Sequence, residues 1–398
     1  MPSLPSSTEL GKSPLNSAPA RPCPAAGYRR RWIRPIIVCA GRVIRVKVRQ
    51  APSLAEVLDG LTAPGELWRR RADGKVECYA CAHRCVIFPG RRGICKVRFN
   101  AAGTLRVPWG YVAALQCDPT EKKPFYHFLP GSSTLTFGML GCDYACDFCQ
   151  NWLTSQALRD PAAGIQPTEI TPREVVALAR RCQAAVVGSS YNEPLITSEW
   201  AVAVFKEARA AGLRTCYVSN GNATVEVLDY LRPWTDAYKV DLKAMTAEHY
   251  RELGGVLSRV LEAIRQIHAR GFWLEVVTLV IPGWNDSDAE LEAAACFLAS
   301  ISPFIPWHVT AFHKDYRMTA PDDTTPQTLL RAARIGEAAG LKYVYAGNLP
   351  GQVGRYEHTW CHHCGTLLVE RWGYLIQQNR LRAGRCPQCG TAIPGIWE

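Results

Sequence analysis

The sequence lacks features that would place it in two common classes of protein. It has no run of 18 apolar residues, so it offers no membrane-spanning helix. It lacks a credible signal peptide, because the apolar part of "RRRWIRPIIVCAG" is followed at once by basic residues and is too short for export. We therefore expect a cytoplasmic protein with no membrane partner.

Net charge is scarce outside the N-terminus. Residues 1–50 hold ten Lys or Arg against one acid, which gives +9 of the formal +11 and leaves +2 for the other 348 residues. A nearly neutral body does not favour nucleic acid as a partner. The N-terminal stretch begins rich in Pro and Ser and poor in aromatics, which predicts a disordered basic extension over residues 1–50; a targeting role is the alternative.

Cysteine, in contrast, is abundant, with 17 residues. A long chain without a signal peptide argues against a disulfide scaffold, so clustered cysteines predict metal sites in a reducing cytosol. Three clusters are present: Cys78, Cys81, Cys85 and Cys95; Cys142, Cys146 and Cys149; and Cys361, Cys364, Cys386 and Cys389. We interpret the six scattered cysteines as small buried hydrophobes or tail residues.

Between the second and third clusters, short β-rich runs alternate with helical segments, which is typical of parallel βα units. Six strands are predicted, in "STLTFGMLG", "AAVVGSSYNEP", "RTCYVSNGN", "AYKVDLKA", "FWLEVVTLVIPGWND" and "PWHVTAFH". Capping boxes at Thr171 with Glu174 and at Ser287 with Glu290 mark helix starts. The pattern predicts an α/β fold, a partial (β/α)6 TIM-like barrel over residues 132–350. Cys-rich modules at 51–131 and 351–398 flank it.

Polar residues collect where the predicted strands end, which is where such barrels build active sites. The first strand is followed by three cysteines in "GCDYACDFCQNW" (residues 141–152). Four thiolates complete a [4Fe–4S] cluster, so three leave one iron open for a ligand. Open zinc is the alternative, but catalytic zinc usually mixes His or carboxylate into its ligand set. The CxxxCxxC spacing, with Phe148 before the last cysteine, resembles the radical S-adenosylmethionine (SAM) superfamily.

The resemblance implies that the open iron binds SAM and that one electron cleaves the sulfonium to a 5′-deoxyadenosyl radical, which abstracts a hydrogen atom from the substrate. Glu193 is similar to the acid that contacts the SAM amino group. Lys243, in "VDLK", is implied to pair with the SAM carboxylate, and Asp241 to orient it. Other cofactor-binding residues are predicted at strand ends: Tyr191, Asn192, Asn220 and His308.

A closer match runs from about Leu67 to the C-terminus. It rests on motifs such as "CYACAHRCVIFPGRRGICKVR", "DPTEKKPFYHFLPGS", "TLVIPGWNDS" and the closing "CHHCG" and "CPQCG". Together these resemble the radical SAM enzyme of the AmmeMemoRadiSam system, within the pyruvate formate-lyase-activating-enzyme-like class. Asp143, Thr120 and Ser190 depart from the usual residues, but no cysteine is missing.

The resemblance implies several partners: SAM, an electron donor such as flavodoxin or ferredoxin, and Memo-like and AMMECR-like proteins. An enzyme that activates a glycyl-radical enzyme is one alternative. The alternative from another class is a catalytically inactive, zinc-organised protein that binds a partner or nucleic acid. Retention of the three cysteines and Glu193 argues against that reading.

The two outer cysteine groups each offer four thiolates. The C-terminal CxxCG pairs, 21 residues apart, predict a zinc ribbon that fastens the chain end to the barrel; a ribbon that binds nucleic acid is the alternative. The N-terminal group suits either zinc or an auxiliary iron–sulfur cluster. The Gly-punctuated loop "VIFPGRRGI" between Cys85 and Cys95 slightly favours zinc.

Overall fold

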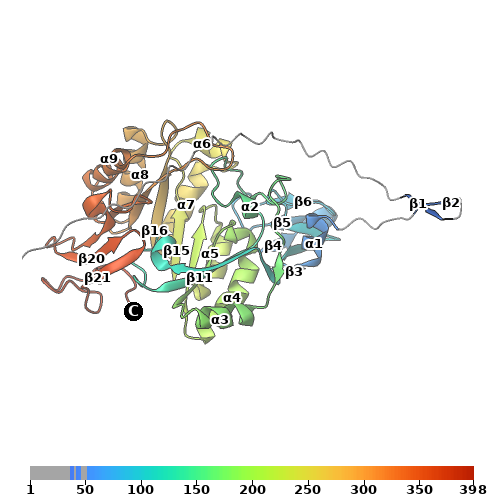
Figure 1. Ribbon diagram of the computed structural model, residues 1–398, viewed down its shortest axis with the longest axis horizontal. Helices are drawn as coiled ribbons and strands as arrows, with labels where there is room; N and C mark the ends of the chain where they lie inside the picture. Colours follow the sequence, from blue (N-terminus) through green and yellow to red (C-terminus); the bar gives the residue numbers. More distant parts are fainter. Residues whose placement is uncertain (1–35, 40–41, 46–51) are drawn as a thin grey trace, which may run out of the picture. The chain divides into compact units, whose positions relative to one another are not determined.

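A computed structural model describes residues 36–39, 42–45 and 52–398 (Figure 1). The chain divides into two units, Met1–Ala51 and Pro52–Glu398. In the first unit, β1 (Ile36–Cys39) and β2 (Arg42–Arg45) pair as antiparallel strands. The rest of the predicted N-terminal extension lies outside the described residues.

The second unit is built on an eight-stranded sheet. Its strands, in spatial order, are β10 (Ala114–Pro119), β11 (Ser133–Gly138), β13 (Val186–Ser189), β14 (Arg214–Ser219), β15 (Ala237–Asp241), β16 (Trp273–Val280), β17 (Trp307–Ala311) and β18 (Val344–Gly347). Neighbours from β11 to β18 are parallel, and β10 is antiparallel to β11. The six predicted strands are confirmed.

The count of six parallel strands was wrong, because β18 adds a seventh. This strand has four residues, too few to show a clear pattern of alternation. β10 and β18 occupy the two edges and are not hydrogen-bonded to each other, so the sheet is open. As in other parallel sheets, all seven carboxyl ends face the same side.

Helices connect the parallel strands. They are α2 (Trp152–Ser155), α3 (Pro172–Arg181), α4 (Ser198–Ala210), α5 (Val225–Leu231), α6 (Ala247–Glu252), α7 (Leu257–Ala269), α8 (Asp288–Ile301) and α9 (Pro326–Ala338). The predicted capping box of α3 is confirmed: the Thr171 hydroxyl accepts from the Glu174 amide, and the Glu174 carboxylate accepts from the Thr171 amide. At α8, Ser287 accepts from the Glu290 amide as predicted, but the Glu290 carboxylate accepts from Met245 N instead of returning to the cap. Within the described residues, no helix is both long enough and apolar enough to span a membrane.

The N-terminal module, residues 52–112, consists of α1 (Leu54–Gly60) and two small antiparallel sheets. One contains β3 (Thr62–Pro64), β8 (Thr104–Pro108) and β7 (Phe99–Ala101), and the other contains β4 (Trp68–Arg70), β5 (Val76–Cys78) and β6 (Val86–Ile87). A short ribbon of β9 (Tyr111–Val112) and β12 (Thr168–Glu169) adjoins them. Arg98 fixes this module to the main domain through a buried 2.7 Å ion pair with Glu199 of α4.

The C-terminal module is a three-stranded antiparallel sheet of β19 (Thr359–Trp360), β20 (Leu367–Trp372) and β21 (Leu375–Asn379). Arg371 of β20 is buried and donates to the Tyr126 carbonyl at 3.0 Å, with its guanidinium 4.2 Å from the ring centroid of the same tyrosine. His127 also contacts the Pro394 carbonyl at 2.6 Å. Within the second unit, the two modules lie toward opposite sides in Figure 1.

Candidate active site

The loop that carries Cys142, Cys146 and Cys149 leaves the carboxyl end of β11. Two glycines let this loop pass close to its neighbours. A Cβ at Gly138 would lie 2.5 Å from the Ser190 carbonyl oxygen, and Gly141 has a φ of 99° with the Cys95 carbonyl oxygen 3.1 Å from where its Cβ would be. The loop is therefore held between the second parallel strand and the N-terminal module.

The three thiols face a buried environment. Cys146 is buried, and burial raises the pKa of its thiol to about 12 against the opposing charge of Lys243. Cys149 lies 3.2 Å from the Ser155 hydroxyl, and Cys142 accepts from the Tyr144 amide at 3.4 Å. Because a thiolate is disfavoured here without a cation, these residues suit a metal centre that supplies positive charge.

Glu193 lies at the end of β13, beside this loop, and is 3% exposed. Its carboxylate accepts from Leu195 N at 3.1 Å, Ser219 Oγ at 2.7 Å and Asn220 N at 2.7 Å. Burial and the nearby charge of Asp143 raise the pKa of Glu193 to about 8 despite these donors. A buried acid whose charge is disfavoured beside a second carboxylate forms a site that a cationic or N–H-donating ligand would stabilise.

Asp143 is the acid that the predicted set of site residues omitted. It accepts from Asn220 Nδ2 and Asn222 Nδ2, both at 2.8 Å, and His83 Nε2 lies 3.9 Å away. An aspartate is unusual directly after the first cysteine, and this feature of the sequence could have identified Asp143 as a site residue. Asn220, predicted as a cofactor contact, is held by Asp143 and by the Asn222 amide, which donates to its Oδ1 at 2.9 Å.

Lys243 and Asp241, after β15, form the cationic side of the rim. Lys243 Nζ lies 3.7 Å from the Asp241 carboxylate and 5.9 Å from the ring centroid of Phe148. Asp241 is also paired with Lys239. Burial alone would lower the pKa of Lys243, but Asp241 and the thiols of Cys146 and Cys149 outweigh it and raise the pKa. The ammonium therefore stays charged next to the cysteine loop.

Tyr191 and Asn192 support the loop from β13. Tyr191 adopts a φ of 69°, its hydroxyl lies 3.0 Å from Lys123 Nζ, and its carbonyl accepts from Thr154 at 3.0 Å. Asn192 accepts from Met139 N at 3.0 Å. The structure thus brings nine predicted residues, the three cysteines included, to the same edge of the sheet. Tyr191 and Asn192 hold the cysteine loop in place there.

Residues 137–294 match the family described as the radical SAM superfamily. An uncharacterized protein, MJ0808, from Methanocaldococcus jannaschii is 35% identical over 326 residues, which cover 81% of this chain and 96% of that protein. The chain belongs to the radical SAM superfamily. It is also 27% identical over 233 residues to pyruvate formate-lyase 1-activating enzyme from Escherichia coli, covering 54% of this chain and 93% of the enzyme.

Among solved structures, a radical SAM methyltransferase from Sphaerobacter thermophilus aligns with a TM-score of 0.44 and 19% identity, covering 60% of this chain and 71% of the other. Membership of the superfamily implies a [4Fe–4S] cluster and SAM as cofactors. The residues fit this pair: three soft thiol donors lie beside two buried acids and a charged lysine.

His308 is placed apart from the other predicted residues of this radical SAM protein. It is the second residue of β17, buried, with Nε2 2.6 Å from the Glu275 carboxylate. Burial lowers the pKa of His308, although Glu275 opposes this. Glu275 also accepts from the amides of Tyr126 and His127. His308 therefore joins a network with Glu275 and Tyr126, and no local sequence pattern could predict this network because its partners are remote along the chain.

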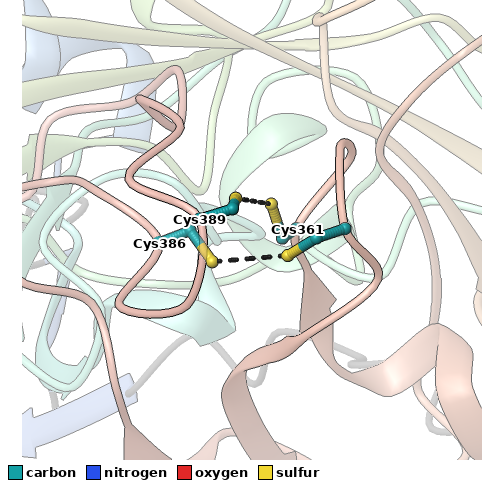
Figure 2. Close-up of side chains that lie close together, drawn as sticks. Cys361, Cys386 and Cys389 are labelled. Carbon is teal, nitrogen blue, oxygen red and sulfur yellow. Dashed lines mark hydrogen bonds between the residues drawn. The ribbon is translucent and has the colours of Figure 1, made fainter.

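The C-terminal four cysteines form a group in which all ligand atoms lie within 4.8 Å of one another. The sulfurs of Cys361 and Cys389, and those of Cys364 and Cys386, are 3.6 Å apart, and Figure 2 shows Cys361, Cys386 and Cys389 turned toward a common centre. Zn–S bonds of about 2.3 Å place tetrahedral thiolates about 3.8 Å apart. The group is thus already shaped for one metal ion.

The N-terminal four cysteines differ. Cys78, Cys81 and Cys95 are buried and Cys85 is half-buried. Burial, followed by the charges of Asp143 and the neighbouring cysteines, raises the pKa of Cys81 well above its usual value. Because the charges of Cys78, Cys95 and Cys85 all act on the Cys81 thiol, the four side chains are neighbours.

A cavity of about 340 Å³ opens where β17 and β18 end. Gln150, directly after the last cysteine of the triad, and His313 lie on one side, with 3.1 Å between Gln150 Nε2 and His313 Nε2. Asn348 and Tyr374 lie on another side and are hydrogen-bonded at 3.0 Å. The C-terminal module therefore provides part of the wall of a cavity that reaches the cysteine loop. The prediction gave this module only the role of fastening the chain end to the barrel.

Proposed function

We propose that this protein is a radical SAM enzyme whose [4Fe–4S] cluster is held by Cys142, Cys146 and Cys149. The observation that carries the proposal is the three-thiol loop at the edge of the sheet, in which Cys146 is buried and Cys142 and Cys149 are half-buried, together with the nearby charges of Asp143, Glu193 and Lys243. When bound, the reduced cluster supplies one electron that cleaves SAM, so that the adenosyl fragment can take a hydrogen atom from a substrate.

Each rim residue has a role that its surroundings support. Glu193 offers a buried acceptor to the amino group of SAM, and Lys243 offers its ammonium to the carboxylate of SAM. Asp241 orients Lys243, while Asn220 fixes the Asp143 side chain. Tyr191 and Asn192 hold the loop after β13 in place. The C-terminal cysteines hold zinc and fasten the module that lines the 340 Å³ cavity.

The motifs from Leu67 onward support membership of the AmmeMemoRadiSam type, with Memo-like and AMMECR-like proteins as partners and a flavodoxin or ferredoxin as the electron donor. Activation of a glycyl-radical enzyme is the second candidate. The 27% identity to pyruvate formate-lyase 1-activating enzyme over 93% of that enzyme favours it. In both cases the substrate is a hydrogen donor that reaches the cavity beside Gln150.

The test is reductive cleavage of SAM. Protein reconstituted with iron and sulfide under anaerobic conditions, then mixed with dithionite and SAM, is expected to release 5′-deoxyadenosine. The control is the same protein without dithionite, which lacks the electron that the cleavage requires. Iron-loaded protein that binds a cluster but releases no 5′-deoxyadenosine would leave the zinc-organised binding protein as the better description.

A further inference from the structure

We infer that the buried carboxylate of Asp143 is a fixed negative charge that lowers the reduction potential of the cluster bound by the cysteine triad. This inference rests on the proposed function, because it concerns the same three thiols. Asp143 follows the first cysteine of the triad directly in the chain. It is a positioning residue that acts through this cysteine and not on SAM itself.

The carboxylate of Asp143 lies against the sulfur of Cys142. Asp143 Oδ1 is 3.8 Å from Cys142 Sγ, and the side chain of Asp143 has no exposed surface. A thiol in this position can donate to the carboxylate, whereas a thiolate that binds iron has no proton left to donate. Iron binding therefore leaves the carboxylate next to a second negative charge, and solvent screens the repulsion between them only weakly.

The hydrogen bonds of Asp143 indicate that its carboxyl group is ionised. Oδ1 accepts from Asn220 Nδ2 and Oδ2 accepts from Asn222 Nδ2, both at 2.8 Å. The orientation of the Asn220 amide is fixed, because its Oδ1 accepts from the backbone amide of Asn222 at 2.9 Å and its Nδ2 is left for Asp143. Each oxygen of Asp143 thus accepts from an amide donor, which is the pattern expected of a carboxylate.

Neutral donors, rather than a cation, hold Asp143. Among the described residues, no Lys or Arg nitrogen lies within 4.0 Å of its carboxylate, and His83 Nε2, at 3.9 Å, makes no hydrogen bond to it. Asp241, another acid of the rim, is paired with Lys239 and Lys243. An amide dipole stabilises a carboxylate but does not cancel its charge, so the charge of Asp143 still acts on its surroundings. Burying such a charge without a cationic partner is unfavourable for folding, which favours a functional role for it.

The loop after β14 is shaped to hold this charge. Gly221, between the two asparagines, has a φ of 76°, and a Cβ there would lie 2.6 Å from Val240 Cγ1, so the turn requires glycine. The turn brings both asparagine side chains to Asp143. The charge is therefore fixed from two sides, by its own loop and by this turn.

A negative charge beside a ligand sulfur opposes the addition of an electron. The reduction potential of an iron–sulfur cluster depends on the net charge, the hydrogen bonds to its sulfurs and its exposure. The other two sulfurs have different neighbours, because Cys149 lies 3.2 Å from the Ser155 hydroxyl and the positive charge of Lys243 acts on Cys146. Asp143 therefore makes the cluster harder to reduce and, after it has taken one electron from the external donor, a stronger reductant toward the sulfonium of SAM.

The midpoint potential of the reconstituted cluster, without SAM, tests the inference. Titration with dithionite is followed by electron paramagnetic resonance, and the signal that disappears in Cys146→Ala identifies the cluster of the triad. Asp143→Asn keeps the size of the side chain and removes its charge. We expect the equilibrium constant for one-electron reduction to rise at least tenfold, which raises the potential by about 59 mV or more. An unchanged potential, with the signal retained, would overturn the inference.

Asp147→Asn is the matched control. Asp147 lies between the second and third cysteines of the same loop, but its side chain is 60% exposed and solvent screens its charge. The same substitution there should change the equilibrium constant for reduction less than twofold. A shift as large as that of Asp143→Asn would show that any carboxylate of the loop has this effect, and the role assigned to Asp143 would be wrong.

Asn222→Ala gives a second measurement, which is independent of whether Asp143→Asn retains its cluster. This variant removes a hydrogen-bond donor from the carboxylate and leaves the charge, so the potential should fall, opposite to the shift of Asp143→Asn. If Asp143 only holds the two loops together, both variants should instead destabilise the metal-free protein and move the potential in the same direction or not at all. A wild-type protein without the signal that depends on Cys146 would count against the proposed function, because the variants are compared only where that signal is present.

Discussion

The cysteine triad at the edge of the sheet and the four cysteines of the C-terminal module bind metal, on our proposal, in opposite ways. The C-terminal sulfurs already face one another at 3.6 Å, and the group contains four ligands. The triad has three ligands, and its surroundings contain Glu193, Asp143 and Lys243. A closed shell stabilises a fold, whereas an incomplete one among buried charges is arranged to receive a ligand.

The thiol acidities follow this division only in part, because burial raises the pKa of Cys361 in the C-terminal group to about 12 as well. The hydroxyl and then the amide of Thr366 lower the pKa of Cys364 to about 6, so this exposed residue is ready to bind metal as a thiolate. Burial raises the pKa of Cys146 to about 12, so its thiolate depends on a bound cation. The comparison predicts that changes at the triad act on chemistry, while changes at the C-terminal group act on stability.

The largest effect is expected for Cys146→Ala. Two thiolates are too few to hold the cluster at the edge of the sheet, so the variant should release no 5′-deoxyadenosine above background. The measurement is product quantified after anaerobic reduction in the presence of SAM. Cys296→Ala serves as the control, because Cys296 is an exposed residue of α8. Undiminished cleavage by Cys146→Ala would remove the distinction between the two sites.

A smaller effect is expected for Glu193→Gln, which keeps the shape of the side chain and removes its charge. Loss of a charge-assisted hydrogen bond costs about 1.5–3 kcal/mol, or roughly tenfold to hundredfold in the affinity for SAM. Equilibrium binding to the reconstituted protein at a pH above the Glu193 pKa of about 8 measures this, and the iron content should not change. Glu207→Gln, a half-buried residue of α4 that is no part of the predicted site, is the matched control. Equal affinity in wild type and Glu193→Gln would give Glu193 a purely structural role.

The strand pattern and the triad could be predicted because both depend on neighbours in sequence. Alternating β and α segments indicated the parallel sheet, and spacing alone identified Cys142, Cys146 and Cys149. What could not be predicted depends on remote pairs. His308 is paired with Glu275 on the adjacent strand and packs against Tyr126, and Asp143 is fixed by asparagines nearly 80 residues away. Nothing in a local pattern records such contacts.

The pH dependence of SAM affinity should show directly how Asp143 affects the protonation of Glu193. Burial and Asp143 raise the pKa of Glu193 to about 8, so below that pH its carboxyl is protonated and no longer accepts from the SAM amino group. The affinity of the wild type should fall as pH is lowered from 9 to 6, by at most about tenfold per unit below the pKa. In Glu193→Gln this contribution should vanish. Because titration of SAM itself is common to both proteins, the difference between their profiles isolates Glu193; parallel profiles would contradict the assignment.

The smallest effect on SAM cleavage is expected for Cys361→Ser, which removes a buried thiolate from the C-terminal group. Zinc should be lost, because three thiolates and a hydroxyl no longer form the closed shell, and the melting temperature should fall by roughly 5–10 °C. Release of 5′-deoxyadenosine per bound cluster should change less than twofold at 20 °C, since the group lies apart from the cysteine loop. Metal analysis, thermal unfolding and the cleavage assay on one preparation check all three. If Cys361→Ser keeps its melting temperature but loses cleavage, the C-terminal module acts on the chemistry through the cavity wall that contains Tyr374, and the division between a stabilising and a reactive metal site no longer holds.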